Sequence, residues 1–301
     1  MTPTILLLVA VLFAPTIADT VTWDRYKQNF KDVRVLGPLP DFNATELALE
    51  LCGITELQPG DFDGLPNLNS IRLDNNKVQH LEPSVFTSVN GLRGLFLEHN
   101  LLTKVPRFWE LSLFPNMTTL SLSHNKISKL DDPKTFSSMN SLERLSLHTN
   151  GISYIYPDIF KPLTKLQIIS LHHNNITYIP DKLFHINSLR IIFLQNNMIR
   201  YIAPNAISSS KLETLFLKKN RLNYLPQRFV FNLKSASTNF YLFKFNGNPW
   251  QCACLLEVLA EVNNTGITYD EKTDSCESRG VPCDRSEGVL QLESEHTRNR
   301  E

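Results

Sequence analysis

LETLFLKKNRL, residues 212–222, places leucines at its first, fourth, sixth and last positions and an asparagine at its ninth. Side chains alternate across a β-strand, so Leu215 and Leu217 point to one side and Phe216, between them, points to the other. Asn220 follows where the chain leaves the strand, and its amide can satisfy backbone groups that would otherwise be buried unpaired. The stretch therefore predicts a short strand with one buried face, ended by an inward-facing asparagine.

The same frame, LxxLxLxxNxL, returns along the chain in steps of about 23–28 residues, the period of leucine-rich repeats. Nine units, of which the first and last are degenerate, occupy residues 44–54, 68–78, 92–102, 117–127, 142–152, 166–176, 189–199, 212–222 and 240–250. No unit can bury its apolar face alone, so the nine are expected to stack. The predicted fold class is α/β: a curved leucine-rich repeat solenoid over residues 44–250, with a parallel β-sheet on its concave face and irregular or short helical segments on its convex side.

Each unit after the first contributes an asparagine that we expect to face inward: Asn76, Asn100, Asn125, Asn150, Asn174, Asn197, Asn220 and Asn248. The second half of most units returns the chain with an apolar residue followed by a phenylalanine, as in Leu57 and Phe62 or Ile179 and Phe184. In the first unit Cys52 stands at the asparagine position. We interpret it as a buried, reduced thiol, and the alternative is an intermolecular disulfide.

The C-terminal end of the array reads NPWQCACLLEVLAE (248–261), a CxC motif running into a short amphipathic helix, with Cys276 and Cys283 downstream. This resembles the cysteine-rich C-terminal flank of extracellular leucine-rich repeat proteins such as Slit, the Toll receptors and secreted insect immune proteins. Four cysteines allow three connectivities from sequence alone. The resemblance implies Cys252–Cys276 and Cys254–Cys283, and hence a disulfide-locked cap over residues 251–284.

The two termini differ in character from the array. Residues 1–18 have the length, apolar content and small C-terminal residues of a signal peptide, which predicts a secreted, extracellular protein. Residues 19–43 contain no cysteine but carry Trp23, Tyr26 and Phe30 at helical spacing, so we expect a non-disulfide cap there. Residues 285–301 are charged throughout and are expected to be disordered.

Composition narrows the class of partner. Acidic and basic residues balance at 30 each, which argues against nucleic-acid binding. After the signal peptide no apolar run is long enough to span a bilayer. Four Asn-x-Ser/Thr sequons, at Asn43, Asn116, Asn175 and Asn263, predict a glycoprotein. We expect a monomer or a non-covalent oligomer.

Five of the eight histidines fall just before the inward asparagine in four successive units: His99, His124, His148, His172 and His173. A metal site needs ligands that converge on one point, and these imidazoles are expected to spread along a surface without interleaved carboxylates. We therefore predict no metal and no cofactor. A contact surface that responds to pH is the functional interpretation, because histidine titrates near neutral pH. The alternative is that histidine simply suits an exposed face.

Outward residues at the centre of the strands run from Arg72 and Phe96 through three serines to two phenylalanines and Lys244. Exposed phenylalanines are enriched at binding hot spots, although packing between adjacent repeats is an equal alternative. Charge along this face drifts from acidic to basic, from Glu50, Asp74 and Glu98 to Lys218, Lys219 and Lys244. The predicted ligand-binding residues are Phe96, His99, Ser121, His124, Arg144, Ser146, His148, Ser170, His172, His173, Phe193 and Phe216.

No nucleophile elbow, phosphate-binding glycine loop or carboxylate pair is present in the sequence, so we do not expect an enzyme. The leading interpretation is a secreted glycoprotein that binds an extracellular protein or glycan through its concave face. Its resemblance to the secreted insect proteins implies innate immune recognition. The alternative is an adhesion or matrix-associated role.

Overall fold

The computed structural model describes residues 20–22, 45–111, 114–269 and 282–286. The chain divides into two compact units, residues 1–151 and 152–301, and each is described by itself. In both units a parallel sheet is built from the strands of the repeat frame.

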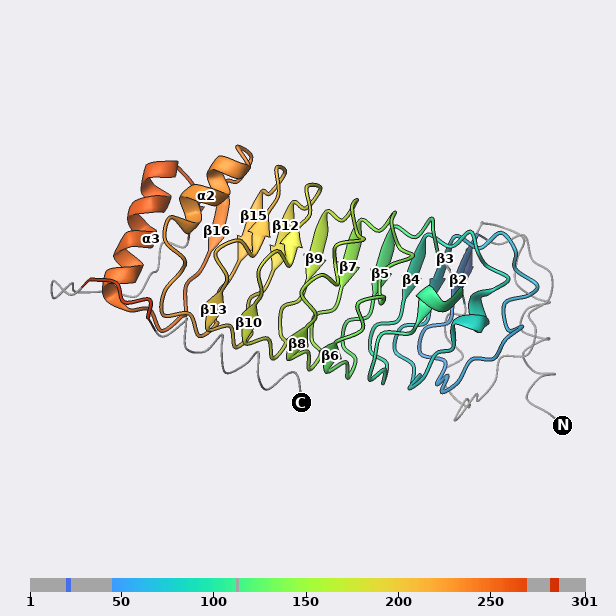
Figure 1. Ribbon diagram of the computed structural model, residues 1–301. Coiled ribbons are helices and arrows are strands. Elements are labelled where there is room, and N and C mark those ends of the chain that lie inside the picture. The colour runs from blue at the N-terminus through green and yellow to red at the C-terminus, as the bar shows by residue number, and fades with distance from the viewer. Residues whose placement is uncertain (1–19, 23–44, 112–113, 270–281, 287–301) are drawn as a thin grey trace. The chain divides into compact units, whose positions relative to one another are not determined.

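The sheet of the first unit follows the order of the repeats (Figure 1). Its strands are β1 (Thr20–Thr22), β2 (Glu46–Ala48), β3 (Ser70–Arg72), β4 (Gly94–Phe96), β5 (Thr119–Ser121) and β7 (Arg144–Ser146). All neighbouring pairs are parallel, and the register aligns the fourth frame position of each repeat with that of the next, as Leu95 with Leu120. These aligned residues are buried, as the alternation of the frame predicted.

The second unit has the same architecture. Its strands β9 (Ile168–Ser170), β12 (Ile191–Phe193), β15 (Thr214–Phe216), β16 (Leu242–Lys244) and β17 (Thr268–Tyr269) pair in parallel in that order. Every repeat frame therefore carries a strand at its third to fifth positions. The prediction of a leucine-rich repeat solenoid with parallel strands is confirmed.

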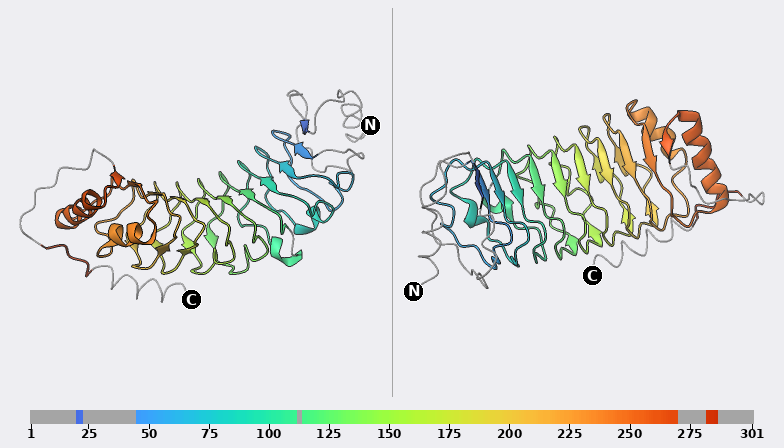
Figure 2. Two further views of the ribbon diagram at one scale, coloured as in Figure 1. Left: turned by 90° about the horizontal axis from the view of Figure 1, so that it is seen from above. Right: turned by 180° about the vertical axis from the view of Figure 1, so that it is seen from behind.

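The return halves of the repeats run on the side away from the parallel strands within each unit (Figure 2). In the first unit they contain two 3₁₀ helices, η1 (Pro83–Phe86) and η2 (Phe108–Leu111), and the short strand β6 (Lys129–Leu130). In the second they contain β8 (Tyr154–Ile155) and two parallel pairs: β10 (Tyr178–Ile179) with β13 (Tyr201–Ile202), and β11 (Phe184–His185) with β14 (Ile207–Ser208).

The predicted inward asparagines form a hydrogen-bonded ladder. Asn220 Nδ2 donates to Leu194 O of the preceding repeat at 2.9 Å and to Leu217 O of its own repeat at 3.0 Å. Its Oδ1 accepts from the backbone N–H of Ile199 at 3.1 Å. Asn100 in the first unit makes the equivalent bonds to Leu73 O, Leu97 O and Val78 N–H. Each asparagine thus joins two successive repeats through backbone groups that have no partner within the strand ladder.

A column of buried phenylalanines fills the return side of the core. In the first unit Phe62 and Phe86 stack with ring centroids 5.7 Å apart, and in the second Phe160 and Phe184 stack at 6.0 Å. All four rings are fully buried. Aromatic pairs at such distances contribute about 0.5–1.5 kcal/mol beyond the area that they bury.

The eighth position of every frame has a left-handed backbone, which the sequence did not lead us to expect. Residues there have φ between 51° and 58°, and the glycine in the last frame has φ 72°. These residues are Leu51, Asn75, His99, His124, Thr149, His173, Asn196, Lys219 and Gly247. Asparagine, histidine and glycine are the residues that tolerate this conformation best, because it crowds most side chains.

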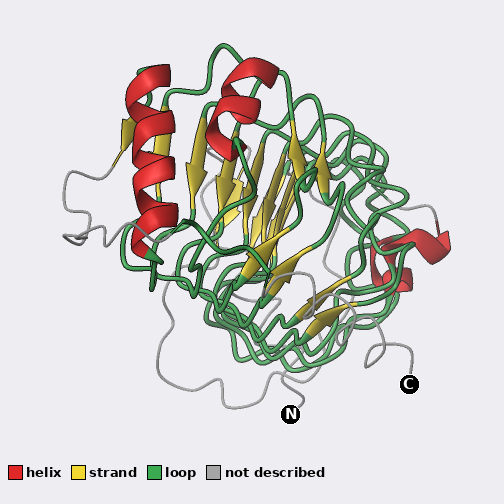
Figure 3. Cartoon of the chain, turned by 60° about the vertical axis from the view of Figure 1, so that its left-hand side comes forward, coloured by secondary structure: helices red, strands yellow, loops and turns green. Residues whose placement is uncertain are grey.

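Helix α3 (Cys252–Thr265) lies in the predicted C-terminal cap and contacts α2 (Phe229–Ala236), which precedes the last repeat frame (Figure 3). Glu261 Oε2 on α3 accepts hydrogen bonds from the N–H groups of Val230 and Phe231 in the first turn of α2, at 2.8 and 3.1 Å. A carboxylate at a helix N-terminus satisfies orphan donors and interacts favourably with the helix dipole.

One predicted disulfide is confirmed: Cys254 is bonded to Cys283, with their Cα atoms 4.7 Å apart. Cys252 is also disulfide-bonded, but Cys276, its predicted partner, lies outside the described residues. The signal peptide 1–18, Asn43, the tail beyond Ser286 and the N-terminal cap 19–43, apart from β1, likewise lie outside them. These expectations remain predictions.

The expectation that Cys52 is buried was wrong, because its side chain is half-exposed. The thiol donates to Glu50 O, two residues away, at 3.4 Å. It lacks the amide with which an asparagine at this position would reach a neighbouring repeat. Partial burial, and then the nearby charge of Glu50, raise the pKa of the thiol, so Cys52 is a poor nucleophile.

Candidate functional site

The surface formed by the outward side chains at the third, fifth, seventh and eighth frame positions is called the strand face here. All twelve predicted ligand-binding residues lie at these positions. In the first unit they stand on or just after β4, β5 and β7, and in the second on or just after β9, β12 and β15.

Several charged side chains on the strand face of the first unit are bound to one another. Arg72 Nε donates to Glu50 Oε1 at 2.5 Å, and its Nη2 lies 3.1 Å from Asp74 Oδ2. Asp74 Oδ1 also accepts the N–H of Glu98 at 2.9 Å. Burial raises the pKa of the Asp74 carboxyl, and this effect outweighs the hydrogen bond and Arg72, which act to lower it.

The same network covers two of the predicted contact residues. The Arg72 guanidinium lies over the Phe96 ring, 4.8 Å from its centroid, and the Phe96 side chain is half-exposed. Ser121 donates from Oγ to Glu98 Oε1 at 2.6 Å and is only 3% exposed. Glu98 from the neighbouring repeat therefore already binds the hydroxyl of this predicted contact residue. Ser146 is half-exposed and Arg144 is exposed.

Histidines of the first unit contact each other in sequence. The rings of His99 and His124 stack with centroids 3.9 Å apart, and His124 meets His148 edge-on at 5.1 Å. His148 Nδ1 lies 3.1 Å from Thr149 Oγ1. Within the part of the chain that the structure describes, no group of three or more histidine, cysteine or acidic side chains is placed to hold a metal ion.

The left-handed eighth position explains much of the histidine pattern. His99, His124 and His173 all occupy it, and histidine is among the residues enriched in that backbone conformation. Only His148 and His172, at the seventh position, lack this explanation. The sequence alone could not have separated the two groups, because the backbone angle is not visible in the frame.

The strand face of the second unit carries an aromatic stack. Phe193 and Phe216 lie in register on β12 and β15, with ring centroids 4.8 Å apart and planes within 10°. His172 meets Phe193 edge-on at 6.0 Å. The two phenylalanines pack together, as one of the two sequence interpretations proposed, yet both remain half-exposed. Half-exposed Ser170 is in register beside Phe193.

His173 is tied to the next repeat. Asn196 Nδ2 lies 3.2 Å from His173 Nε2, so the amide donates to an unprotonated ring nitrogen. Protonation of that nitrogen would remove the acceptor and with it this hydrogen bond.

Charge in the second unit is distributed differently from the first. Its four complete frames, from residue 166 to residue 250, contain five basic side chains and one acidic side chain. The acid, Glu213, accepts two hydrogen bonds from Arg190, at 2.8 and 3.1 Å. The remaining bases are Lys218, Lys219, Arg221 and Lys244.

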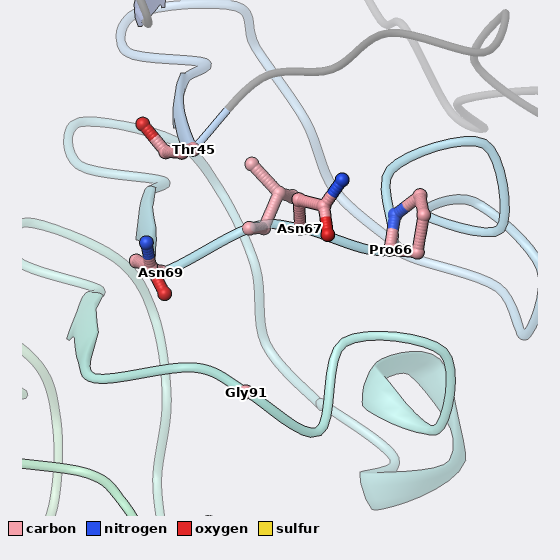
Figure 4. A pocket seen from close by; sticks show the side chains of 6 residues that line it. Thr45, Pro66, Asn67, Asn69 and Gly91 are labelled. Atoms are coloured by element: carbon pink, nitrogen blue, oxygen red, sulfur yellow. The ribbon is translucent and has the colours of Figure 1, made fainter.

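A hollow outside the strand face is lined by Thr45, Pro66, Asn67, Leu68, Asn69 and Gly91 (Figure 4). It lies where β2 and β3 begin, and it contains none of the predicted contact residues. Its lining has no ionisable side chain.

Three predicted glycosylation sites fall within the described residues. Asn116, Asn175 and Asn263 are all exposed. Asn116 precedes its repeat frame, Asn175 follows the inward asparagine, and Asn263 lies on α3. None stands at a strand-face position.

A known family model matches the sequence that forms the repeat frame, the asparagine ladder and the parallel strands. The leucine rich repeat model matches residues 42–102, 115–176 and 164–222, more than half of the chain. The protein belongs to the leucine rich repeat family. Mimecan of Mus musculus is 31% identical over 129 residues, which cover 42% of this chain and 41% of mimecan. Lumican of Gallus gallus is 32% identical over 141 residues, which cover 40% of this chain and 41% of lumican.

The chain thus spans under half the length of these two leucine rich repeat relatives, which are secreted proteins of the extracellular matrix and are non-enzymatic. Among solved structures, a chain of the octameric complex of Latrophilin 3, Unc5D and FLRT2 superimposes with a TM-score of 0.68. It is 24% identical, and the match covers 82% of this chain and 75% of that one. This likeness shows the fold alone. None of the helices that the structure describes in this leucine rich repeat protein is long and apolar enough to cross a membrane.

Proposed function

We propose that this leucine rich repeat protein is a secreted glycoprotein that binds an extracellular protein partner through its strand face. The observation that carries the proposal is the Phe193–Phe216 stack, which remains half-exposed on a sheet whose other face is fully packed. Aromatic side chains that stay partly exposed to solvent at the centre of a rigid surface are typical of binding hot spots.

A matrix-associated role is favoured over innate immune recognition. The sequence relatives mimecan and lumican are extracellular matrix proteins, which supports the first role. The immune role is supported by the resemblance of the cysteine-rich flank to that of secreted insect immune proteins. Binding of the secreted chain to extracellular matrix extract, compared with binding to intact microbial cells, separates the two roles.

The binding surface is tested by capturing partners with the full secreted chain, cross-linking them and mapping the cross-linked residues. Cross-links are expected at strand-face positions, and Phe193→Ala is expected to weaken binding at least tenfold, about 1.4 kcal/mol. Phe231→Ala is the matched control, because Phe231 is 43% exposed on α2, off the strand face. Cross-links confined to the return side, or equal losses in both variants, would refute the proposal.

A further inference from the structure

We propose that the second unit carries a further binding site, beside the strand face, for a sulfated glycan. The site is formed by Tyr178, Tyr201, Arg200 and Arg221 and is called the tyrosine ridge here, with Lys219 at its border with the strand face. It lies where the chain has passed the inward asparagine and turns into the return half of each repeat. The inference goes beyond the proposed function, because it assigns a second class of ligand to a second surface.

Tyrosine recurs at one place in four successive repeats of the second unit, two residues after the end of the frame. The four are Tyr154, Tyr178, Tyr201 and Tyr224. Tyr178 and Tyr201 are in register on β10 and β13, and their rings stack with centroids 5.6 Å apart and planes within 8° (Figure 1). Both side chains are half-exposed. The ridge thus presents phenol groups, which donate and accept hydrogen bonds, at a regular interval, and such a surface matches a linear polymer with a repeating unit.

Two arginines lie on neighbouring repeats beside this stack. The backbone N–H of Arg221 donates to Ile199 O at 2.9 Å, so Arg221 stands across from the peptide bond that joins Ile199 to Arg200. Backbones paired in this way are about 5 Å apart. Lys219 precedes Arg221 by two residues, and all three basic side chains are exposed. Among the residues that the structure describes, none of these three bases forms an ion pair.

Another pair of charges on neighbouring repeats of this unit is opposite in sign. Arg190 donates two hydrogen bonds to Glu213 of the next repeat, at 2.8 and 3.1 Å. Arg200 and Arg221 are also about one repeat apart but carry like charges, and like charges that face each other on neighbouring strands are destabilising. A bound oxyanion would offset this repulsion, because guanidinium groups bind oxyanions through paired hydrogen bonds. The arrangement therefore favours an anionic ligand.

The surroundings of the ridge favour a glycan over an acidic peptide. Partial burial, and then the charge of Asp181, raise the pKa of the Tyr201 hydroxyl. A negative charge thus lies at the tyrosine end, so we expect sulfates beside the arginines and uncharged sugar hydroxyls along the tyrosines. An acidic peptide would need a pocket for an apolar anchor. The apolar neighbour of the ridge is Met198, which is 36% exposed and stands on the surface.

A predicted glycosylation site leaves the arginines accessible. Asn175, Met198 and Arg221 occupy the tenth frame position in three successive repeats. A glycan on Asn175 therefore starts two repeats, or about 10 Å, from Arg221. The test consequently uses the secreted chain with its glycans in place.

The test measures binding of a heparin octasaccharide to the full secreted chain by isothermal titration calorimetry. Binding is expected, and its affinity should fall as salt is raised, because exposed charges are screened. Arg200→Gln/Lys219→Gln/Arg221→Gln should weaken binding at least tenfold. Arg200→Lys/Arg221→Lys keeps the charge but loses the forked donors of the guanidinium groups, so it should weaken binding by a smaller factor.

Lys161→Gln/Lys165→Gln/Lys211→Gln is the matched control, because it also removes three exposed charges from this unit, in the return halves that precede the frames. It should bind heparin like the wild type. Equal losses in the two triple variants, or no binding of heparin by the secreted chain, would refute the site. Polyglutamate that binds as tightly as heparin and depends on the same arginines would assign the ridge to acidic peptides and overturn the proposal. Hyaluronan, which has carboxylates but no sulfate, should bind more weakly, and equal binding would overturn the assignment to a sulfated ligand.

Discussion

The two strand faces differ sharply although they are built on the same frame. In the first unit Arg72, Glu50, Asp74, Glu98 and Ser121 form a network of ion pairs and hydrogen bonds. In the second unit a phenylalanine stack lies among lysines. The backbone, the asparagine ladder and the register are the same in both. The contrast teaches that the frame determines stability, whereas a few outward positions determine what each surface can bind.

If both units share one frame, the loss of one ladder asparagine should lower the free energy of unfolding by about the same amount in either unit. Asn220→Ala in the second unit and Asn100→Ala in the first each remove an acceptor and at least two donated hydrogen bonds. Each buried group left unpaired costs about 1–3 kcal/mol, so we expect a loss of about 3 kcal/mol or more in the free energy of unfolding for each variant. Urea denaturation measures both losses, and a difference between them of more than about 2 kcal/mol would show that the two units do not share one framework.

The cap is expected to distinguish the two units. Removal of the Cys254–Cys283 bridge by Cys254→Ser/Cys283→Ser should cost about 2–4 kcal/mol, because it frees a loop of 29 residues in the unfolded chain. Amide hydrogen exchange should speed up in α3 and β16 and stay unchanged in β3 and β4, since contacts in a repeat array are local. Faster exchange in both units would contradict this local description.

Aromatic side chains give the most direct comparison of binding. Phe216→Ala should weaken capture of a partner by about 1–2 kcal/mol, whereas Phe96→Ala should cost less than about 0.5 kcal/mol, because Arg72 covers the Phe96 ring. Surface plasmon resonance with the captured partner measures both values. A larger loss for Phe96→Ala would place the binding surface in the first unit.

The smallest expected effect is the pH response of Asp74. Its pKa is raised in the folded protein, so the folded state holds this proton more tightly than the unfolded chain does. The ionised carboxyl therefore costs stability at neutral pH, and the wild type should gain stability relative to Asp74→Asn as pH falls towards 4. The gain is expected to be below about 1 kcal/mol, and chemical denaturation of both proteins between pH 4 and 7 measures it. If the difference in the free energy of unfolding between wild type and Asp74→Asn stayed constant across this range, Arg72 would offset the effect of burial on the pKa of Asp74.

Period and alternation were sufficient to predict the strands, the ladder and the buried phenylalanines, because each depends on a residue's own place in the frame. Contacts between neighbouring repeats were harder to predict from the sequence. The burial of Ser121 depends on how Glu98 reaches across from the neighbouring repeat, and the half-exposure of Cys52 could not be seen from its place in the frame. The left-handed eighth position was missed as well, since no single residue type marks it. Which outward residues bind a partner is a property of their neighbours and still a prediction.

The hydrogen bonds between the Glu261 carboxylate and the first turn of α2 have a consequence for folding during synthesis. Val230 and Phe231 donate to an oxygen that lies 31 and 30 residues further along the chain. A ribosome adds about 5–20 residues each second, so the first turn of α2 emerges a few seconds before the group that satisfies it. During that interval its N–H groups must be hydrated, and the newest repeat has an unfinished edge. The end of the repeat array is thus complete only after α3 has emerged. A chain released before that point would leave the N–H groups of Val230 and Phe231 without their acceptor.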